Sequence, residues 1–133
     1  MIGILIVAHG ALGECLIHCA SHVMGRRPLR VRQLGVTVHD DPEALLPHAR
    51  DLIRDLDHGD GVLVLSDICG ATPCNIASRL IEPGRVELIA GVSLPMLVRA
   101  LTYREEALTS VVAKAMAGGA NGVMHISPTG QCA

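Results

Sequence analysis

A doubly wound α/β fold with a mainly parallel sheet is predicted by short apolar runs that alternate with helical patterns along the chain. The run Gly3 to Ala8 is unbroken and stops at His9-Gly10, which is typical of a parallel strand buried on both faces. Val62 to Leu65 is a second run without polar alternation. Because segments with helical periodicity separate such runs, we expect helices on both faces of the sheet.

Two elements are predicted directly after the first strand. Ala11 to Met24 predicts a helix, with Gly25 as the expected stop. Its apolar positions at helical spacing predict the face that packs on the sheet, namely Leu12, Cys15, Leu16, Cys19 and Val23. Val31 to Val36 predicts the second strand, because β-branched residues favour extended backbone.

The rest of the chain repeats this alternation. The next elements are a helix, a strand, a short helix and a strand, over Glu43 to Leu56, Val62 to Leu65, Ile76 to Leu80 and Val86 to Ala90. Two helical segments and a last short strand follow, over Leu97 to Leu101, Glu105 to Ala117 and Gly122 to Ile126. Gly118-Gly119 is the expected end of the last helix.

The composition fits one domain over residues 1–133, with residues 127–133 as a flexible tail. The core must be aliphatic, because the chain has no Trp or Phe and only one Tyr. A formal net charge of -2, from 11 Lys and Arg against 13 Asp and Glu, gives no electrostatic footprint for nucleic acid. No apolar stretch approaches the roughly 20 residues of a membrane span, and the apolar start lacks a signal peptide's basic leader, so a cytoplasmic location is expected.

The cysteines and paired histidines predict neither a disulfide framework nor a metal site. The five cysteines are odd in number and form no CxxC motif, so reduced thiols are expected at Cys15, Cys19, Cys69, Cys74 and Cys132. Cys15 and Cys19 are interpreted as small buried hydrophobes. His18 and His22 stand four apart, a spacing that can bind metal, but no carboxylate or further ligand is placed with them, so a solvated face is predicted.

His9 and Asp67 are the candidate catalytic residues. Each follows a buried strand, and the carboxyl ends of parallel strands share the sheet edge where ligands bind. An imidazole can act as a nucleophile, and a neighbouring carboxylate can hold one ring nitrogen as a proton-bearing donor and leave the other free to attack.

The loop after Asp67 is a candidate anion cradle. Gly70 and Ala71 are small enough to let backbone N–H groups point inward, and Thr72 adds a hydroxyl. This loop is not a P-loop, because no Gly-Lys-Ser/Thr follows and the only lysine is Lys114. These features predict a phosphohistidine site without a cofactor, supplied by another phosphoprotein rather than by ATP. Leu12, Ile68 and Met96 are candidates for the rim of the partner surface, although core packing is the favoured interpretation of each.

Three sequence blocks, Ile4 to Gly10, Leu65 to Arg79 and Ile89 to Leu97, resemble the IIA component of the mannose-type phosphoenolpyruvate-dependent sugar phosphotransferase system. The resemblance implies that His9, through Nε2, accepts a phosphoryl group from the carrier HPr and passes it to a IIB domain or a regulatory target. It also implies that Asp67 orients the ring and that Thr72 contacts the phosphoryl group.

The same resemblance implies a homodimer in which an antiparallel C-terminal strand, here Gly122 to Ile126, is exchanged between subunits. Two positions depart from the family pattern: Gly70-Ala71 stands for a pair of glycines, and Ser93 stands for asparagine. The added methyl group of Ala71 bears on whether that turn reaches positive φ.

Several alternatives remain open from the sequence. The phosphotransfer subunit for dihydroxyacetone kinase shares the fold and the histidine, and a regulatory module is compatible with the same site chemistry. A metal-dependent tetrapyrrole chelatase also carries a strand-end His-Gly and would use a second histidine such as His125 as a ligand. The sequence does not separate sugar uptake from regulation.

Overall fold

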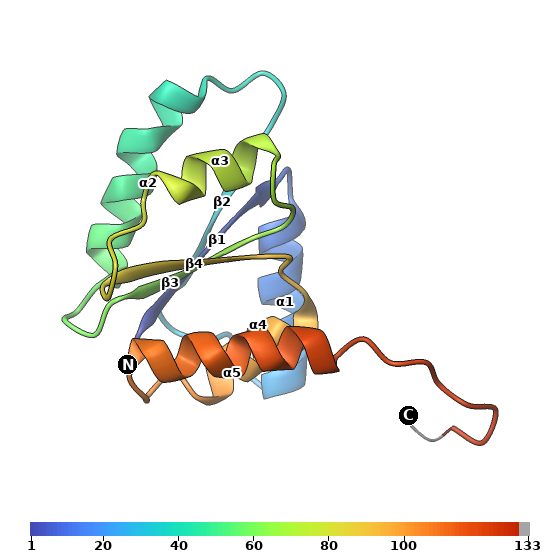
Figure 1. Cartoon of the computed structure of the whole chain (residues 1–133). Helices are drawn as coiled ribbons and strands as arrows, with labels where there is room; N and C mark the ends of the chain where they lie inside the picture. Colours follow the sequence, from blue (N-terminus) through green and yellow to red (C-terminus); the bar gives the residue numbers. More distant parts are fainter. Residues whose placement is uncertain (131–133) are drawn as a thin grey trace.

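The computed structural model describes residues 1–130 and confirms the predicted alternation of strands and helices (Figure 1). Its elements, in chain order, are β1 (Gly3–His9), α1 (Leu12–Met24), β2 (Val31–Val36), α2 (Pro42–Leu56), β3 (Val62–Ser66), α3 (Thr72–Ser78), β4 (Val86–Ala90), α4 (Leu94–Thr102) and α5 (Leu108–Asn121). The predicted α/β fold class is therefore correct. The short helix predicted over Ile76 to Leu80 begins earlier, because α3 already starts at Thr72 and so includes Asn75.

The four strands of the described chain form one parallel sheet in the order β2-β1-β3-β4. The chain moves from β1 outward to β2 and then crosses back past β1 to β3. Because parallel crossovers are right-handed, that change of direction places α1 on one face of the sheet and α2 and α3 on the other (Figure 1). The carboxyl ends of β1 and β3 therefore meet at the switch point, where ligands bind in such sheets.

The side chains of β1 alternate between two aliphatic cores. Ile4 and Ile6 contribute to the core beneath α1, α4 and α5, and Leu5 and Val7 contribute to the core beneath α2 and α3. All four side chains are completely buried. The expectation of a core without aromatic residues is confirmed, and β1 is buried on both faces.

Arg104 closes the amino-terminal end of the sheet. Its guanidinium donates hydrogen bonds to the carbonyl oxygens of Ile2 at 2.8 and 3.2 Å, of Leu29 at 2.6 Å and of Arg30 at 3.0 Å. The side chain is buried, and burial, together with nearby Arg30, lowers the pKa of Arg104 to about 10, although Glu105 acts in the opposite sense. The group therefore stays charged at neutral pH and satisfies carbonyls just before β1 and β2.

The predicted packing face of α1 is wrong except at Leu16, which is half-buried and packs against the core. The buried residues of the helix are Gly13, Ile17 and Ala20, whereas the predicted face is exposed or half-buried at Leu12, Cys15, Leu16, Cys19 and Val23. The close approach of α1 to the sheet explains the choice: a Cβ on Gly13 would lie 2.9 Å from the Cβ of Gln33. Cys15 and Cys19 are consequently exposed thiols rather than buried hydrophobes.

Gly118-Gly119 does not end α5, which runs on to Asn121. A Cβ on Gly118 would lie 2.6 Å from the Cβ of Arg99, so this glycine permits α5 to pack closely against α4. The predicted boundaries of both helices shift as well, because α4 already begins at Leu94, after the Ser93 cap, and α5 begins only at Leu108.

The segment Gly122 to Ile126 makes no strand with the sheet of its own chain. It leaves the end of α5 and extends away from the other elements (Figure 1). Its apolar side chains Val123, Met124 and Ile126 are exposed. The predicted flexible tail lies partly, and Cys132 entirely, outside the described residues. Within residues 1–130, no helix is long and apolar enough to cross a membrane.

Arg104→Met is expected to lower the free energy of unfolding by about 2–4 kcal/mol, because the carbonyl oxygen of the buried residue Ile2 loses both hydrogen bonds from the guanidinium. Arg104→Lys should recover part of the loss, since one ammonium group reaches fewer carbonyls than a guanidinium fork. Urea unfolding measures both values. Arg26→Met, at an exposed arginine, is the matched control and should change stability by no more than about 0.5 kcal/mol. Equal stability of the Arg104→Met and Arg26→Met proteins would contradict the expectation.

Candidate functional site

The candidate site forms where β1 and β3 end side by side. His9 is the last residue of β1, and Asp67 directly follows Ser66, the last residue of β3. The Nδ1 atom of His9 lies 2.7 Å from Oδ2 of Asp67, and the same oxygen accepts the backbone N–H of His9 at 2.9 Å. One carboxylate oxygen therefore holds both the main chain and the ring of His9. The predicted proximity of these two residues is confirmed.

The two side chains differ sharply in exposure. Asp67 is only 12% exposed, whereas His9 is 56% exposed. With Nδ1 facing the carboxylate, the hydrogen bond to Asp67 favours the tautomer with its proton on Nδ1 and leaves the lone pair on Nε2. The arrangement thus presents a nucleophilic ring nitrogen on an oriented, accessible imidazole.

Burial and hydrogen bonding act in opposite directions on Asp67. Burial raises the pKa of its carboxyl group, but hydrogen bonds from the His9 backbone, the His9 ring and the Ile68 backbone together hold that pKa below its ordinary value. The Ile68 N–H donates to Oδ1 at 2.9 Å, so both carboxylate oxygens have donors. The carboxylate is therefore ionised at neutral pH and accepts a hydrogen bond at each of its oxygens.

The loop after Asp67, predicted as an anion cradle, turns at Gly70. Gly70 adopts φ of 92°, a left-handed conformation, while Ala71 is extended with φ of -96° and caps α3. The methyl group of Ala71 is therefore compatible with the turn, because positive φ is needed only at Gly70. Thr72 is exposed and lines a small hollow with Pro42, and no hydrogen bond among the described residues joins it to His9 or Asp67.

The turn after β4 lies at the same sheet edge. Gly91 has φ of 87°, and the Val92 N–H donates to the carbonyl oxygen of Ser66 at 2.9 Å. Ser93 then caps α4, accepting a hydrogen bond from the Met96 N–H at 3.3 Å. The serine at this position thus serves as a helix cap.

Gly35 is a supporting residue that the sequence interpretation missed. A Cβ at this position of β2 would lie 2.3 Å from the carbonyl oxygen of Gly10, the residue after His9. Gly10 itself has φ of 52° and donates to Val36 at 2.9 Å. A glycine inside a predicted strand is the signal that indicates such a close approach of two backbones.

The amino-terminal end of α1 lies three residues beyond His9. Its cap residue, Ala11, makes no side-chain hydrogen bond to the first turn. First-turn N–H groups have no partner inside a helix, and the end of a helix dipole there is positive. This end of α1 is therefore suited to an anion on or near His9.

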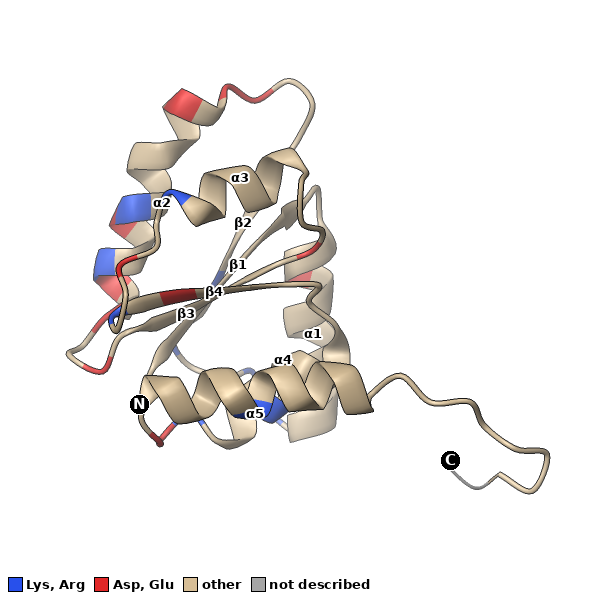
Figure 2. Ribbon diagram, viewed as in Figure 1, with Lys and Arg blue, Asp and Glu red and all other residues tan. Residues whose placement is uncertain are grey.

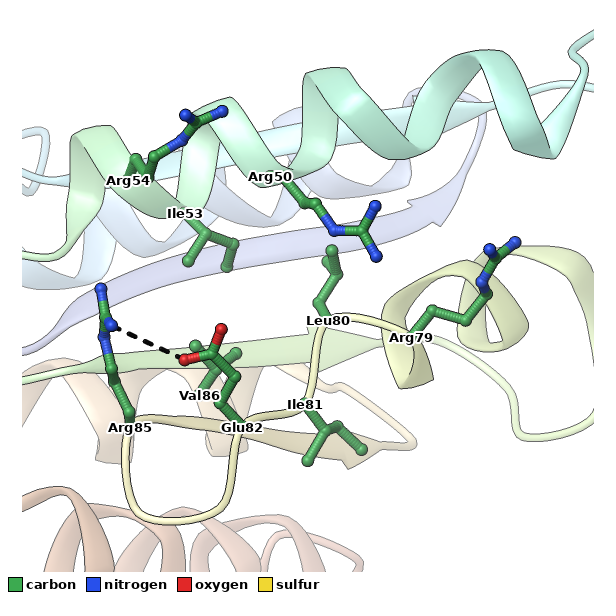
Figure 3. A pocket seen from close by; sticks show the side chains of 9 residues that line it. All are labelled: Arg50, Ile53, Arg54, Arg79, Leu80, Ile81, Glu82, Arg85 and Val86. Carbon is green, nitrogen blue, oxygen red and sulfur yellow. Dashed lines mark ion pairs between the residues drawn. The ribbon is translucent and has the colours of Figure 1, made fainter.

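An arginine-lined hollow of about 620 Å³ lies away from His9, beside the first residue of β4, Val86 (Figure 3). The helix α2 lies on one side of this hollow, and basic and acidic residues alternate along its ribbon (Figure 2). Three of its four arginines already pair with carboxylates: Arg54 with Asp51, Arg79 with Glu43, and Arg85 with Asp57 and Glu82. Most of the positive charge that lines this hollow is thus already neutralised by carboxylates of the same chain.

Within residues 1–130, no group of three or more His, Cys, Asp or Glu side chains is arranged to hold a metal ion. His125, the second histidine expected of a chelatase, lies beyond α5 in the exposed segment that leaves the domain. The geometry around His9 is that of an oriented nucleophile.

Comparison with known proteins adds independent evidence. Residues 3–116 match the EIIA-man family, described as the PTS system fructose IIA component. The mannose-specific EIIAB component of Escherichia coli (strain K12) is 34% identical over 125 residues, covering 92% of this chain and 38% of that protein. The chain therefore spans well under half the length of this relative.

Two solved structures share the fold. Phosphotransferase system component EIIA from Streptococcus agalactiae has a TM-score of 0.83 at 24% identity, covering 94% of this chain and 97% of that one. The mannose/sorbose specific IIA subunit from Enterococcus faecalis has a TM-score of 0.84 at 20% identity, covering 95% of each chain.

The lowered pKa of Asp67 predicts a specific pH dependence of stability. The ionised Asp67 carboxylate contributes fully to the free energy of unfolding at pH values above 3.8, the ordinary pKa of an aspartate. This contribution is lost as the pH falls through the lower pKa of Asp67 in the folded state. Asp67→Asn lacks this titration, so the stabilities of wild type and variant should converge as the pH falls from about 5 toward 3. Urea unfolding across this range tests it. Asp55→Asn, at an exposed carboxyl group on α2, should give a curve parallel to that of the wild type; a parallel curve for Asp67→Asn would refute the role of these hydrogen bonds.

Proposed function

Because this chain belongs to the IIA family of the mannose and fructose phosphotransferase systems, we propose that His9 carries a phosphoryl group between two partner proteins. The donor is phospho-HPr, and the acceptor is a IIB domain or a regulatory target. The observation that carries this proposal is the 2.7 Å contact of His9 Nδ1 with Asp67 on a ring that is half exposed. Proteins of this kind act in the cytoplasm, where the proposal places the chain.

The proposed step is a direct displacement at phosphorus. The Nε2 lone pair attacks the phosphorus atom while the bond to the donor's leaving atom breaks, so that a new P–Nε2 bond forms in line with the departing group. The His9 ring keeps its Nδ1 proton and becomes positively charged. The adjacent Asp67 carboxylate offsets that charge. Transfer onward reverses the step toward the acceptor.

Hydrogen-bond donors close to His9 in the sequence can stabilise the negative charge of the transferred phosphoryl group. The first turn of α1, which follows His9 closely, offers N–H groups that have no partner within the helix. The small residues Gly70 and Ala71, which directly precede α3, are assigned to phosphoryl binding as well. We assign Thr72 to phosphoryl contact when a partner is docked, because its hydroxyl is exposed at the first residue of α3. No cofactor is required for this chemistry.

The surface around His9 supports docking of a protein partner. Leu12 and Ile68, each close in sequence to a site residue, are 41% and 59% exposed. Met96, the third candidate, is buried in the core beneath α4, as the favoured interpretation of core packing predicted. An exposed apolar rim around an accessible nucleophile suits transient protein contact better than a small-molecule substrate.

Incubation with phosphoenolpyruvate, enzyme I and HPr is expected to add one acid-labile phosphoryl group, measured by intact-protein mass spectrometry. His9→Ala should take up none, while His48→Ala, at an exposed histidine on α2, should match the wild type. Asp67→Asn should slow uptake by about 100-fold or more, because the ring loses its orientation and its counter-charge. Phosphate on another residue, or full uptake by His9→Ala, would overturn the assignment.

We also propose that the chain forms a homodimer by exchanging the segment Gly122 to Ile126. β4 is an edge strand of the described sheet, and beyond its first residue, which pairs with Glu82, its outer edge is open. The exposed Val123, Met124 and Ile126 supply apolar side chains to an added strand.

Removal of residues 122–133 is therefore expected to convert a dimer into a monomer in sedimentation-velocity experiments. Replacement of Val123 and Ile126 by Ser is the milder variant, and it should weaken association by about tenfold or more because it removes two apolar anchors. Ser127→Ala, just outside the segment, is the control and should dimerise like the wild type. A truncated chain that still sediments as a dimer would rule out exchange as the basis of association.

A further inference from the structure

His18 and His22 form a close imidazole pair on α1 that the proposed phosphotransfer does not use. Their Nε2 atoms lie 3.3 Å apart, with ring centroids separated by 4.8 Å and ring planes inclined at 73°. Both side chains are exposed, and with Ser21 and Gly25 they line a shallow surface hollow. The two nitrogens that face one another are the ones that bind metal ions when the protons reside on Nδ1.

The separation of the two nitrogens matches a coordination geometry. Two imidazole nitrogens bound at about 2.0–2.1 Å to one tetrahedral ion stand roughly 3.3–3.4 Å apart. The pair therefore has the required spacing without a change of backbone. We propose that His18 and His22 together bind one divalent transition-metal ion of the zinc type through their two Nε2 atoms.

The helix that carries the pair does not itself repel a cation, although Arg26 and Arg27 follow directly after Gly25. Glu14 is the only charged residue of α1, and Arg27 holds its carboxylate at 2.9 Å, so α1 itself carries no Lys or Arg to repel an ion (Figure 2). His22 lies in the last turn of α1, before Gly25 ends the helix in a left-handed conformation. The carbonyl groups of a last turn carry partial negative charge, which favours a bound cation.

The ion is bound by two protein ligands and is exchangeable. No third His, Cys, Asp or Glu of residues 1–130 is arranged with the pair, so water completes the coordination shell. Ser21 does not compete for the ion, because its hydroxyl donates to the Ile17 carbonyl oxygen at 2.8 Å. Binding ties together two residues one turn apart, so it stabilises α1, and this stabilisation grows with the logarithm of the ion concentration once the site is saturated.

Calorimetric titration of the full chain with ZnCl₂ tests this site. The wild type should bind one ion at the pair. His18→Ala and His22→Ala should each raise the apparent Kd by at least about tenfold, because only one of the two imidazole ligands remains. His48→Ala is the matched histidine control and should bind as the wild type does. In nitrogen-15 NMR spectra, the Nε2 resonances of His18 and His22 should both shift on addition of zinc.

The exposed thiols of Cys15 and Cys19 on the same helix are the competing ligands. The double variant Cys15→Ser/Cys19→Ser should retain the wild-type affinity at the histidine pair. Loss of binding in that double variant, unchanged binding in both histidine-to-alanine variants, or the absence of saturable binding would each overturn the proposal. Circular dichroism of each variant verifies that α1 is intact, which is expected because all four side chains are exposed.

Discussion

The burial of β1 on both faces and between two parallel neighbours is the constraint on which the rest of the structure depends. Its side chains alternate between the two cores, so every helix layer is positioned against this one strand. A strand in that situation has only its two ends free for polar groups. The polar groups at the two ends are Arg104 at the start and His9 with Asp67 at the finish.

The two ends of β1 use hydrogen bonds in opposite ways. At the start, a cation donates to backbone carbonyls and has no carboxylate partner among its hydrogen bonds, so its charge is spread over neutral acceptors. At the finish, the Asp67 carboxylate collects donors from the main chain and ring of His9. Such an anion in a largely buried position is stable only because its donors are complete. Rigidity at the start of β1 thus supports a defined geometry at its end.

The parallel α/β architecture with helices on both faces and the pairing of His9 with Asp67 follow from patterns that apolar runs and strand ends make visible, whereas the strand order comes from the structure. The predictions that were wrong concern positions where a helix approaches the sheet or another helix closely. On α1, Gly13 and Ala20 face the sheet because they are small, whereas periodicity favours larger residues such as Leu12 and Val23. Gly118 resembles a helix stop but permits a helix crossing, and the distinction depends on Arg99, which is remote in sequence. Arg104 has no sequence signal at all, since its acceptors are backbone atoms.

The hydrogen bonds of Arg104 also join residues 102 positions apart in the chain. The ribosome makes β1 early. The carbonyl oxygen of Ile2, just before β1, nevertheless receives the hydrogen bonds of Arg104 only after most of the chain has been synthesised. Native contacts that span so much sequence close late and slow folding. Until Arg104, which follows α4, has been synthesised, the amino-terminal end of β1 lacks these hydrogen bonds. The sheet that carries His9 and Asp67 at its other end therefore becomes fully hydrogen-bonded only at a late stage of synthesis.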